Sequence, residues 1–319
     1  MRPVRLASLL AAACAVAAGC GGSSSAPAGP APAASSPAST ASHHARSGRL
    51  TPAAARRIVA ELWTQREAAL SALSGPEIGR LETAVAATED RAYAGDVRCG
   101  CASAKAGHTI MSILPEIPRS APDGAFFAQV RTTNTTTGEL PWYVIAVVRR
   151  GAYWKIAYVN FGGYKARPPL SALGVTPGTV AAVTPRDRAR MVRIARLETA
   201  WAGAHATRVE HTSYGATIRA RAALRPEADG VFGLTLPGGR VFACYTLHEL
   251  DTYTLRGGLA QDAAREQWGR QLAPGGYRSI VVDTDQPYCV AGTGRGSTVP
   301  PTWLQYTPQR VAVTGTRLF

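Results

Sequence analysis

Apolar residues recur at helical spacing in two stretches, and each stretch opens with a threonine–proline pair. After Thr51-Pro52 the apolar positions are Ile58, Leu62, Trp63, Ala69, Leu70 and Leu73. After Thr184-Pro185 they are Met191, Ile194, Leu197 and Trp201. Threonine is a favourable N-cap and proline suits the first helical turn, so each pair predicts a helix start. Both starts fit Thr-Pro-x4-Arg-[Ile/Met]-Val, which indicates a duplicated unit.

Runs of β-branched and aromatic residues follow each helical stretch. A further helix is expected from Pro76 to about Ala92, and another from about Leu259 to Leu272. The predicted strands are His108–Leu114, Ala125–Thr133, Leu140–Arg149, Ala152–Val159, Val231–Leu236, Val241–Leu247, Tyr277–Asp283 and Gln309–Arg317. Arg150-Gly151 is a hairpin signal. Helices ahead of antiparallel strands predict an α+β fold of two tandem units, each with N-terminal helices packed on an antiparallel sheet.

The first twenty residues have the pattern of an export signal. Arg2 and Arg5 precede an apolar run from Leu6 to Ala18, which as a helix would cover roughly 20 Å of the ~30 Å hydrocarbon core. The run is therefore a cleavable segment, not a membrane span. Ala17-Ala18-Gly19-Cys20 resembles the lipobox of bacterial lipoproteins, which implies that Cys20 receives a diacylglycerol before cleavage. An ordinary secretory signal cut nearby is the alternative.

Composition divides the remainder of the chain. Residues 20–49 are rich in alanine, serine and proline and cannot bury enough apolar surface to fold, so they predict a disordered tether behind the signal peptide of residues 1–19. Roughly 270 residues remain, more than one small core usually holds. A break from Pro168-Pro169 to Gly178 predicts a first domain over 50–170 and a second over 171–319.

The chain is basic, with a formal net charge of +14. Loss of the signal peptide removes two arginines and leaves 33 basic and 21 acidic residues. A positive surface beside a membrane attracts anionic lipid or an anionic envelope polymer. Nucleic acid is not an expected partner, because the protein is predicted to be exported and contains no recognition module.

Four cysteines remain once Cys14 leaves with the signal and Cys20 carries lipid. In an oxidising compartment they allow three disulfide pairings. A bridge from Cys244 to Cys289 within the second domain is the economical one. Cys99 and Cys101 are then left across a single glycine, either as a small redox-labile bridge or as a metal-binding pair with His108 as the nearest further ligand.

Motifs for catalysis are lacking: the chain has no Gly-x-Ser-x-Gly, His-Glu-x-x-His, phosphate-binding glycine loop or Ser-x-x-Lys. Asp283 and Asp285 could act as paired carboxylates or ligate a cation, although acidic residues before a turn usually cap it or face solvent. His248 lies near Glu249 and Asp251 and could be a general base, although such a histidine is more often hydrated. No catalytic residue, metal or cofactor is predicted.

Aromatic residues gather in the hairpin around Gly151. Alternation sends rings to both faces of the sheet, and one face should be core. The other could line a ligand groove or an interface, for which the candidates are Trp142, Tyr153, Trp154 and Tyr158. A helix packed over the second face explains the rings equally well, and burial in the core is the favoured interpretation.

A tethered lipidated cysteine, Thr-Pro-capped helices, Leu81-Glu82-Thr83 and Asp90-Arg91-Ala92-Tyr93 ahead of a sheet resemble an actinobacterial lipoprotein family of unassigned activity. Its element order is similar to that of cystatin-like and NTF2-like folds. The resemblance spans residues 50–319 and implies an extracytoplasmic, membrane-anchored protein with two units. We therefore expect a binding or envelope-assembly module that recognises a small ligand, a protein or an anionic polymer. A hydrolase on the same fold and a structural spacer are the alternatives.

Overall fold

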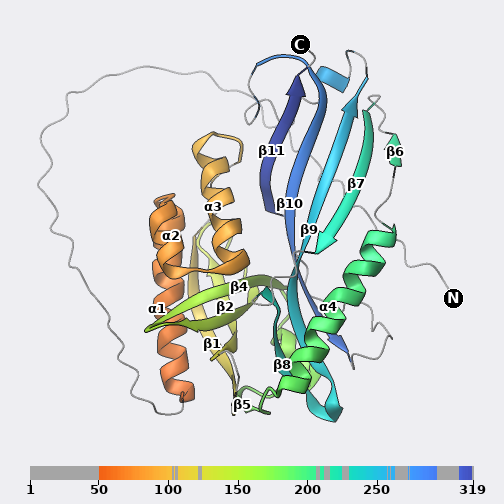
Figure 1. Cartoon of the computed structure of the whole chain (residues 1–319). Coiled ribbons are helices and arrows are strands. Elements are labelled where there is room, and N and C mark those ends of the chain that lie inside the picture. The colour runs from red at the N-terminus through yellow and green to blue at the C-terminus, as the bar shows by residue number, and fades with distance from the viewer. Residues whose placement is uncertain are drawn as a thin grey trace, which may run out of the picture. The chain divides into compact units, whose positions relative to one another are not determined.

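The computed structural model describes residues 50–102, 104, 107–120, 124–205, 209–211, 216–224, 230–256, 258, 260–262, 272, 274–292 and 309–317. Helices lie ahead of antiparallel strands in this part of the chain, which confirms the predicted α+β class (Figure 1). The predicted signal peptide, Cys20 and the tether lie outside the described residues. Among the described helices, none has the length and apolar character that a membrane crossing requires.

The first sheet consists of four consecutive antiparallel strands and one short parallel strand. The strands are β1 (His108–Pro118), β2 (Phe126–Asn134), β3 (Trp142–Arg150), β4 (Tyr153–Gly163) and β5 (Gly178–Val180), in the order β4-β3-β2-β1-β5. Gly151 takes a φ of 61° in the hairpin between β3 and β4, a conformation that favours glycine. The division into domains at residue 170 stays a prediction, and β5, which follows it, pairs with β1.

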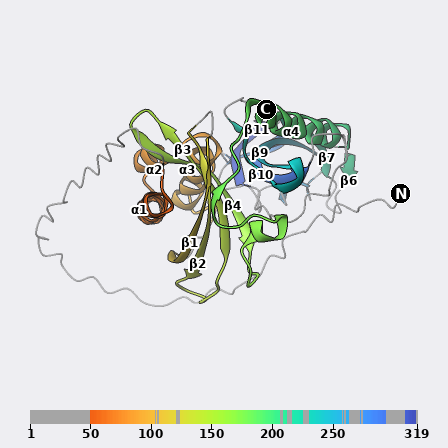
Figure 2. The ribbon, with the colours of Figure 1, turned by 90° about the horizontal axis from the view of Figure 1, so that it is seen from below.

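Three helices cover one face of the first sheet, as Figure 2 shows from below. They are α1 (Pro52–Ser71), α2 (Gly75–Leu81) and α3 (Ala84–Arg98). α1 begins where the sequence predicts, because the Thr51 side chain accepts a hydrogen bond from the Ala54 amide at 3.2 Å and Pro52 occupies the first helical position. Trp63 on α1 is almost completely buried against the sheet.

The prediction of one helix from Pro76 to Ala92 is wrong. α2 ends at Leu81 and α3 starts at Ala84, so the chain breaks at Glu82-Thr83. The Thr83 amide donates to the Ile156 carbonyl of β4 at 2.9 Å, and Ala84 has a φ of 52°. Helical periodicity continues through this break in the sequence, but a sheet contact takes the place of the helical hydrogen bonds.

The first sheet is buried on both faces. Alternate residues of β3 enter different hydrophobic clusters: Ile145 and Val147 pack with the helices, whereas Val144 and Ala146 pack with residues of the second sheet such as Phe242. This two-sided burial explains why β3 is an almost continuous apolar run and not an alternating one.

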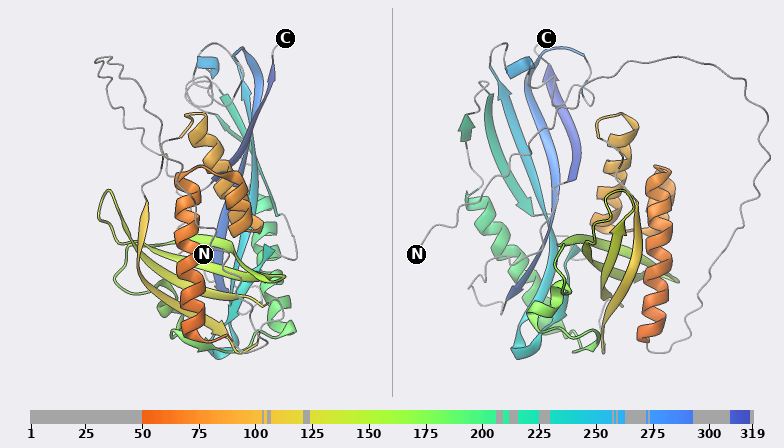
Figure 3. Two further views of the ribbon diagram at one scale, coloured as in Figure 1. Left: turned by 90° about the vertical axis from the view of Figure 1, so that its left-hand side faces the viewer. Right: turned by 180° about the vertical axis from the view of Figure 1, so that it is seen from behind.

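The second sheet follows helix α4 (Pro185–His205). Its strands are β6 (Val209–His211), β7 (Ala216–Leu224), β8 (Phe232–Thr235), β9 (Val241–Leu255), β10 (Tyr277–Gly292) and β11 (Gln309–Arg317). Their order is β11-β10-β9-β7-β6, with β8 also on β9, and the long strands β9 and β10 are seen side by side in Figure 3. Most of the predicted helix from Leu259 to Leu272 lies outside the described residues.

The α4 start also follows the prediction. Thr184 and Asp187 cap the helix reciprocally: the Asp187 amide donates to Thr184 Oγ1 at 3.1 Å, and that hydroxyl donates to the Asp187 carboxylate at 2.7 Å. Two short 3₁₀ turns, Pro169–Leu173 and Pro237–Gly239, complete the described elements.

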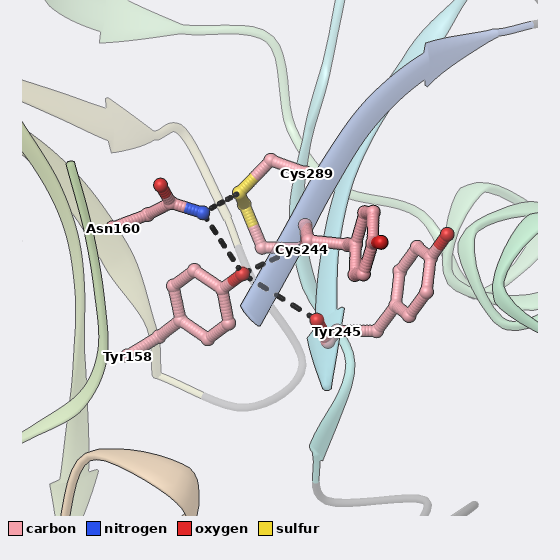
Figure 4. The surroundings of a disulfide bond; sticks show 6 residues. Tyr158, Asn160, Cys244, Tyr245 and Cys289 are labelled. Carbon is pink, nitrogen blue, oxygen red and sulfur yellow. Dashed lines mark hydrogen bonds between the residues drawn. A yellow bond between two sulfur atoms is a disulfide. The ribbon is translucent and has the colours of Figure 1, made fainter. Parts of the chain in front are cut away.

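A disulfide between Cys244 and Cys289 joins β9 and β10 at directly opposed positions. This is the pairing expected from the sequence. Strand β4 of the first sheet contacts the second sheet at this disulfide (Figure 4). The Tyr158 hydroxyl donates to the Tyr288 carbonyl at 2.8 Å, and Asn160 Nδ2 lies 4.0 Å from Cys289 Sγ. The disulfide therefore lies where the two sheets are hydrogen-bonded.

Candidate functional site

A cavity of about 440 Å³ lies between helices α1 and α3 and strands β3 and β4. Small-molecule sites typically have volumes of ~300–1,000 Å³. Its apolar lining is Trp63, Leu70, Leu73, Tyr93, Val97, Tyr143, Val159, Phe161 and Tyr164. Its polar lining is Arg66, Glu67, Ser71, Glu89, Asp90, His108 and Asn160. The lining therefore combines apolar side chains with polar groups that can orient a ligand.

Arg66 is the centre of a buried ion-pair cluster in the cavity wall. Its Nε lies 2.7 Å from Glu82 Oε1, and its Nη2 lies 2.6 Å from Asp90 Oδ2. The Arg66 side chain is 11% exposed, and those of Glu82 and Asp90 are 0% and 8% exposed. α1 supplies the arginine, the break after α2 supplies Glu82, and α3 supplies Asp90, so the cluster ties the three helices together.

The surroundings of Glu82 favour its protonated form. Burial, followed by the negative charge of Asp90, raises the pKa of Glu82 well above its ordinary value. A hydrogen bond between the Glu82 and Asp90 side chains acts in the same direction. Burial lowers the pKa of Arg66, but the surrounding carboxylates, which include Glu67, outweigh burial and raise it. The guanidinium therefore stays charged and compensates its acidic neighbours.

His108, Tyr143 and Glu67 meet at the wall formed by β1, β3 and α1. The Tyr143 hydroxyl lies 3.2 Å from His108 Nε2, and the His108 amide donates to Glu67 Oε2 at 3.0 Å. His108 Nδ1 lies 3.8 Å from the same carboxylate oxygen. Burial raises the pKa of Tyr143 to about 12, so the phenol stays protonated and can donate a hydrogen bond.

Carboxylates outnumber cations among the described residues that line the cavity. Asp90 compensates Arg66, whereas Glu67 and Glu89 add two further formal negative charges. The cavity therefore has the opposite sign to the chain, whose formal charge is +14. Aromatic faces lie next to these charges, and the Arg66 guanidinium itself lies 5.3 Å from the centre of the Trp63 ring. Such a wall is complementary to an organic cation.

The four aromatic residues proposed as a binding surface do not share one face. Trp142 and Tyr158 are buried, and the Trp142 indole donates to the Lys165 carbonyl at 3.0 Å. Trp154 packs edge-on against Phe126, with 5.4 Å between ring centroids. Only Tyr153 of the four is exposed, at 65%. The core interpretation fits Trp142, Tyr158 and Trp154.

The structure brings together two groups that are separate in the sequence. His248 of β9 lies opposite Asp285 of β10, and its Nδ1 is 2.9 Å from Asp285 Oδ1. The same Nδ1 is 3.0 Å from Asp283 Oδ1. Asp251, which is closer to His248 in sequence, takes the opposite parity along β9 and so belongs to the other face of the strand.

Cys99 and Cys101 form a disulfide at the end of α3. A bridge between the two cysteines is therefore observed, and the bonded sulfurs are not available as thiolate ligands; the predicted redox lability of this bridge stays a prediction. His108, considered as a further metal ligand, instead contacts the Tyr143 hydroxyl in the cavity wall.

The sequence did not identify Arg66, its partner Glu82 or Asp90 as site residues, and of these Arg66 and Asp90 line the cavity. A usable signal exists for Arg66: it follows Leu62 by four residues and Trp63 by three, and so lies within the apolar stripe of α1. A charged residue at a buried helical position needs a partner, which indicates an internal ion pair.

No protein-family model, curated protein or solved structure matches this chain. Function is therefore inferred from the cavity and its side chains.

Proposed function

We propose that this protein is a lipid-anchored protein of the extracytoplasmic face of the cell membrane that binds a small organic cation in its cavity. The cavity of about 440 Å³, lined by aromatic rings and by an excess of carboxylates, is the observation that carries the proposal. The lipobox-like Ala17-Ala18-Gly19-Cys20 and the tether that follows support the location.

The charge pattern favours a cation over an anion. Arg66, the one arginine among the described lining residues, is already engaged by three carboxyl groups, those of Glu67, Glu82 and Asp90. An anionic ligand would have to compete with those groups for the guanidinium and would meet Glu67 and Glu89 as well. An ammonium group gains both a carboxylate partner and aromatic faces, worth about 0.5–2 kcal/mol for the latter.

The basic character of the chain supports a separate contact with anionic lipid or an anionic envelope polymer. That contact would hold the folded part of the chain close to the lipid or polymer, while the cavity binds the ligand. A protein that binds at the surface is the third kind of partner expected from the sequence. These contacts are screened by salt over ~8 Å, whereas binding inside the cavity depends less on salt.

Matched ligands test the cavity directly. Tryptamine, the uncharged indole-3-ethanol and the anionic indole-3-acetate present one ring system with three charges. Binding to the full chain in detergent, followed by calorimetry, should be strongest for tryptamine and weakest for indole-3-acetate. Glu67→Gln and Glu89→Gln should weaken tryptamine binding severalfold, and Glu77→Gln, at an exposed position of α2, should leave it unchanged.

A variant that fills the cavity tests where the ligand binds, independently of the ligand's charge. Val97→Phe adds volume at the wall and should reduce binding of tryptamine and indole-3-ethanol alike. Binding that follows the ligand's charge but ignores Val97→Phe would place the site elsewhere on the molecule. Equal binding of all three ligands would contradict the preference for cations.

The contact between Tyr143 and His108 favours a second candidate, an acid–base enzyme that uses the same cavity. A histidine at 3.2 Å from a phenol that stays protonated can pass a proton to or from a bound substrate. Turnover in a screen of ester, peptide, phosphate and glycoside substrates, lost in His108→Gln, would support the enzyme. Binding without turnover would support the binding module.

The anchor has its own test. Cys20→Ser should abolish incorporation of a fatty-acid probe in cells and either release the body or leave the precursor uncleaved. Equal labelling and membrane fractionation of Cys20→Ser would contradict the proposed location, with no consequence for the cavity.

A further inference from the structure

Two neighbouring strands of the second sheet bring one imidazole and two carboxylates to a single point. His248 and Asp285 are directly opposed in the β9–β10 register, and Asp283 lies two residues before Asp285 on the same face of β10. One donor atom from each residue lies within 4.8 Å of the others. This group is separate from the cavity described above, which His248, Asp283 and Asp285 do not line.

The distances between the three side chains match the spacing of adjacent metal ligands. A single Nδ1 lies 2.9 Å from one carboxylate oxygen and 3.0 Å from the other. An imidazole nitrogen carries at most one proton, directed along one line in the ring plane, so it can serve only one of the two acceptors well. Adjacent ligands of an octahedral ion with bonds of about 2.1 Å are about 3.0 Å apart, whereas tetrahedral ligands at this bond length are about 3.4 Å apart.

Burial and sheet geometry hold these groups in place. The His248 and Asp285 side chains are 8% and 5% exposed, and both belong to long paired strands. The Cys244–Cys289 disulfide bridges the same two strands four residues from each of them and fixes the register that opposes histidine to aspartate. The paired strands therefore hold the three side chains at one point of the sheet.

We propose that His248, Asp283 and Asp285 bind one divalent transition-metal ion through Nδ1 and one oxygen of each carboxylate. The proton of the imidazole then resides on Nε2. The Asp283 side chain is 21% exposed, which supplies a path for the ion from solvent. Three protein ligands leave the other positions of an octahedral ion to water. One imidazole with two carboxylates suits Mn²⁺, Fe²⁺ and Co²⁺, whereas calcium prefers an all-oxygen set.

Manganese titration followed by electron paramagnetic resonance tests the site. The full chain in detergent, without a histidine tag, is treated with EDTA, dialysed and titrated with Mn²⁺, whose free-ion signal falls on binding. We expect one bound Mn²⁺ per chain. His248→Gln and Asp285→Asn should each weaken binding at least about tenfold. Asp96→Asn, beside the Cys99–Cys101 disulfide, and Glu89→Gln, in the cavity, are matched controls that should bind as the native protein does.

Two further measurements protect the test from misfolded variants. Asp283→Asn changes a partly exposed side chain and should also weaken binding at least about tenfold while keeping the native circular dichroism spectrum. Mn²⁺ should raise the melting temperature of the native protein and of the two controls, but not that of the three site variants. Bound Co²⁺ should give the weak absorption bands of a six-coordinate ion.

The proposal would be overturned if the free Mn²⁺ signal did not fall when protein and Mn²⁺ are mixed at about 100 µM each. It would also be overturned if the three site variants bound Mn²⁺ as tightly as the native protein. Loss of binding in Glu89→Gln instead would assign the ion to the cavity. An intense four-coordinate Co²⁺ spectrum would contradict the octahedral assignment. None of these outcomes affects tryptamine binding, so the two proposals fail independently.

Discussion

The helical layer and the second sheet each place one basic side chain against two or more carboxyl groups, and they do so with different bases. Arg66 of α1 meets Asp90 of α3 and Glu82, in the break after α2, within 2.7 Å, and Glu67 at 3.3 Å. His248 meets Asp283 and Asp285 within 3.0 Å, and all three come from adjacent strands. Arginine is always charged and has no lone pair to offer, whereas imidazole can release its proton and coordinate a metal.

This difference separates a structural cluster from an exchangeable one. In the Arg66 cluster the guanidinium, which is always charged, compensates the neighbouring carboxyl groups directly. In the His248 cluster Nδ1 can bind a metal ion, which can enter because Asp283 is partly exposed to solvent. A basic side chain among carboxyl groups therefore gives helix cohesion in one region and a candidate binding site in the other.

The largest expected effect tests the structural role of Arg66. Arg66→Met leaves Asp90 buried without its cation and should lower the free energy of unfolding by about 3–5 kcal/mol. Adding Glu82→Gln and Asp90→Asn to Arg66→Met should recover part of the loss, because no buried charge then remains. Urea denaturation measures both differences.

Arg80→Met is the matched control on α2. Its guanidinium is 59% exposed and pairs with Glu77 at the surface, so the expected loss is no more than about 1 kcal/mol. Equal destabilisation by Arg66→Met and Arg80→Met would remove the distinction between a buried structural cluster and a surface ion pair.

Local signals in the sequence predicted the local features of the fold. The Thr51 and Thr184 side chains accept hydrogen bonds from amides three residues further along the chain. The turn at Gly151 depends only on the positive φ that glycine adopts easily. These starts and turns, together with the strands they separate, gave the α+β class correctly. The break at Glu82-Thr83 was missed because the contacts formed there are distant in sequence: the Thr83 amide donates to the Ile156 carbonyl of β4, and Glu82 accepts from Arg66 of α1.

The candidate sites needed the tertiary register. His248 and Asp285 are separated by 37 residues, and only the β9–β10 pairing makes them neighbours. The sequence showed each as an ordinary loop-edge residue because it did not reveal which strand pairs with which. The predicted Cys244–Cys289 disulfide could have supplied the register. If these two cysteines are directly opposed on neighbouring strands, the residues four positions away, His248 and Asp285, are opposed as well.

Glu116 extends the comparison of the two clusters, because it is a buried carboxyl group whose described contacts are neutral and include no basic side chain. Gln129 Nε2 donates to Glu116 Oε1 at 2.7 Å, and burial raises the pKa of Glu116 from 4.5 to about 7. Since the folded-state pKa is the higher one, stability is retained below pH 4.5 and falls as the pH rises to about 7. Glu116→Gln should remove this loss and raise the free energy of unfolding at pH 8 by up to about 3 kcal/mol.

Urea denaturation of both proteins at pH 4.5 and pH 8 isolates this effect, because the other carboxyl groups are common to both. The two proteins should be nearly equally stable at pH 4.5. Glu77→Gln, at an exposed position of α2, controls for the amide itself. A difference between native and Glu116→Gln protein that does not change with pH would show that Glu116 is ionised in the fold without penalty.

The smallest expected effect concerns the link between the two regions. Tyr158→Phe removes the hydroxyl that donates to the Tyr288 carbonyl beside the disulfide, and should lower the free energy of unfolding by about 1–2 kcal/mol. Tyr153→Phe makes the same chemical change at an exposed position of the same strand and should have an effect within about 0.5 kcal/mol. Combining Tyr158→Phe with Arg66→Met, and separately with Asp285→Asn, measures whether this link couples the clusters. Additivity within about 0.5 kcal/mol in both pairs would show two independent clusters, as their different bases predict, whereas a larger interaction energy would make them parts of one network.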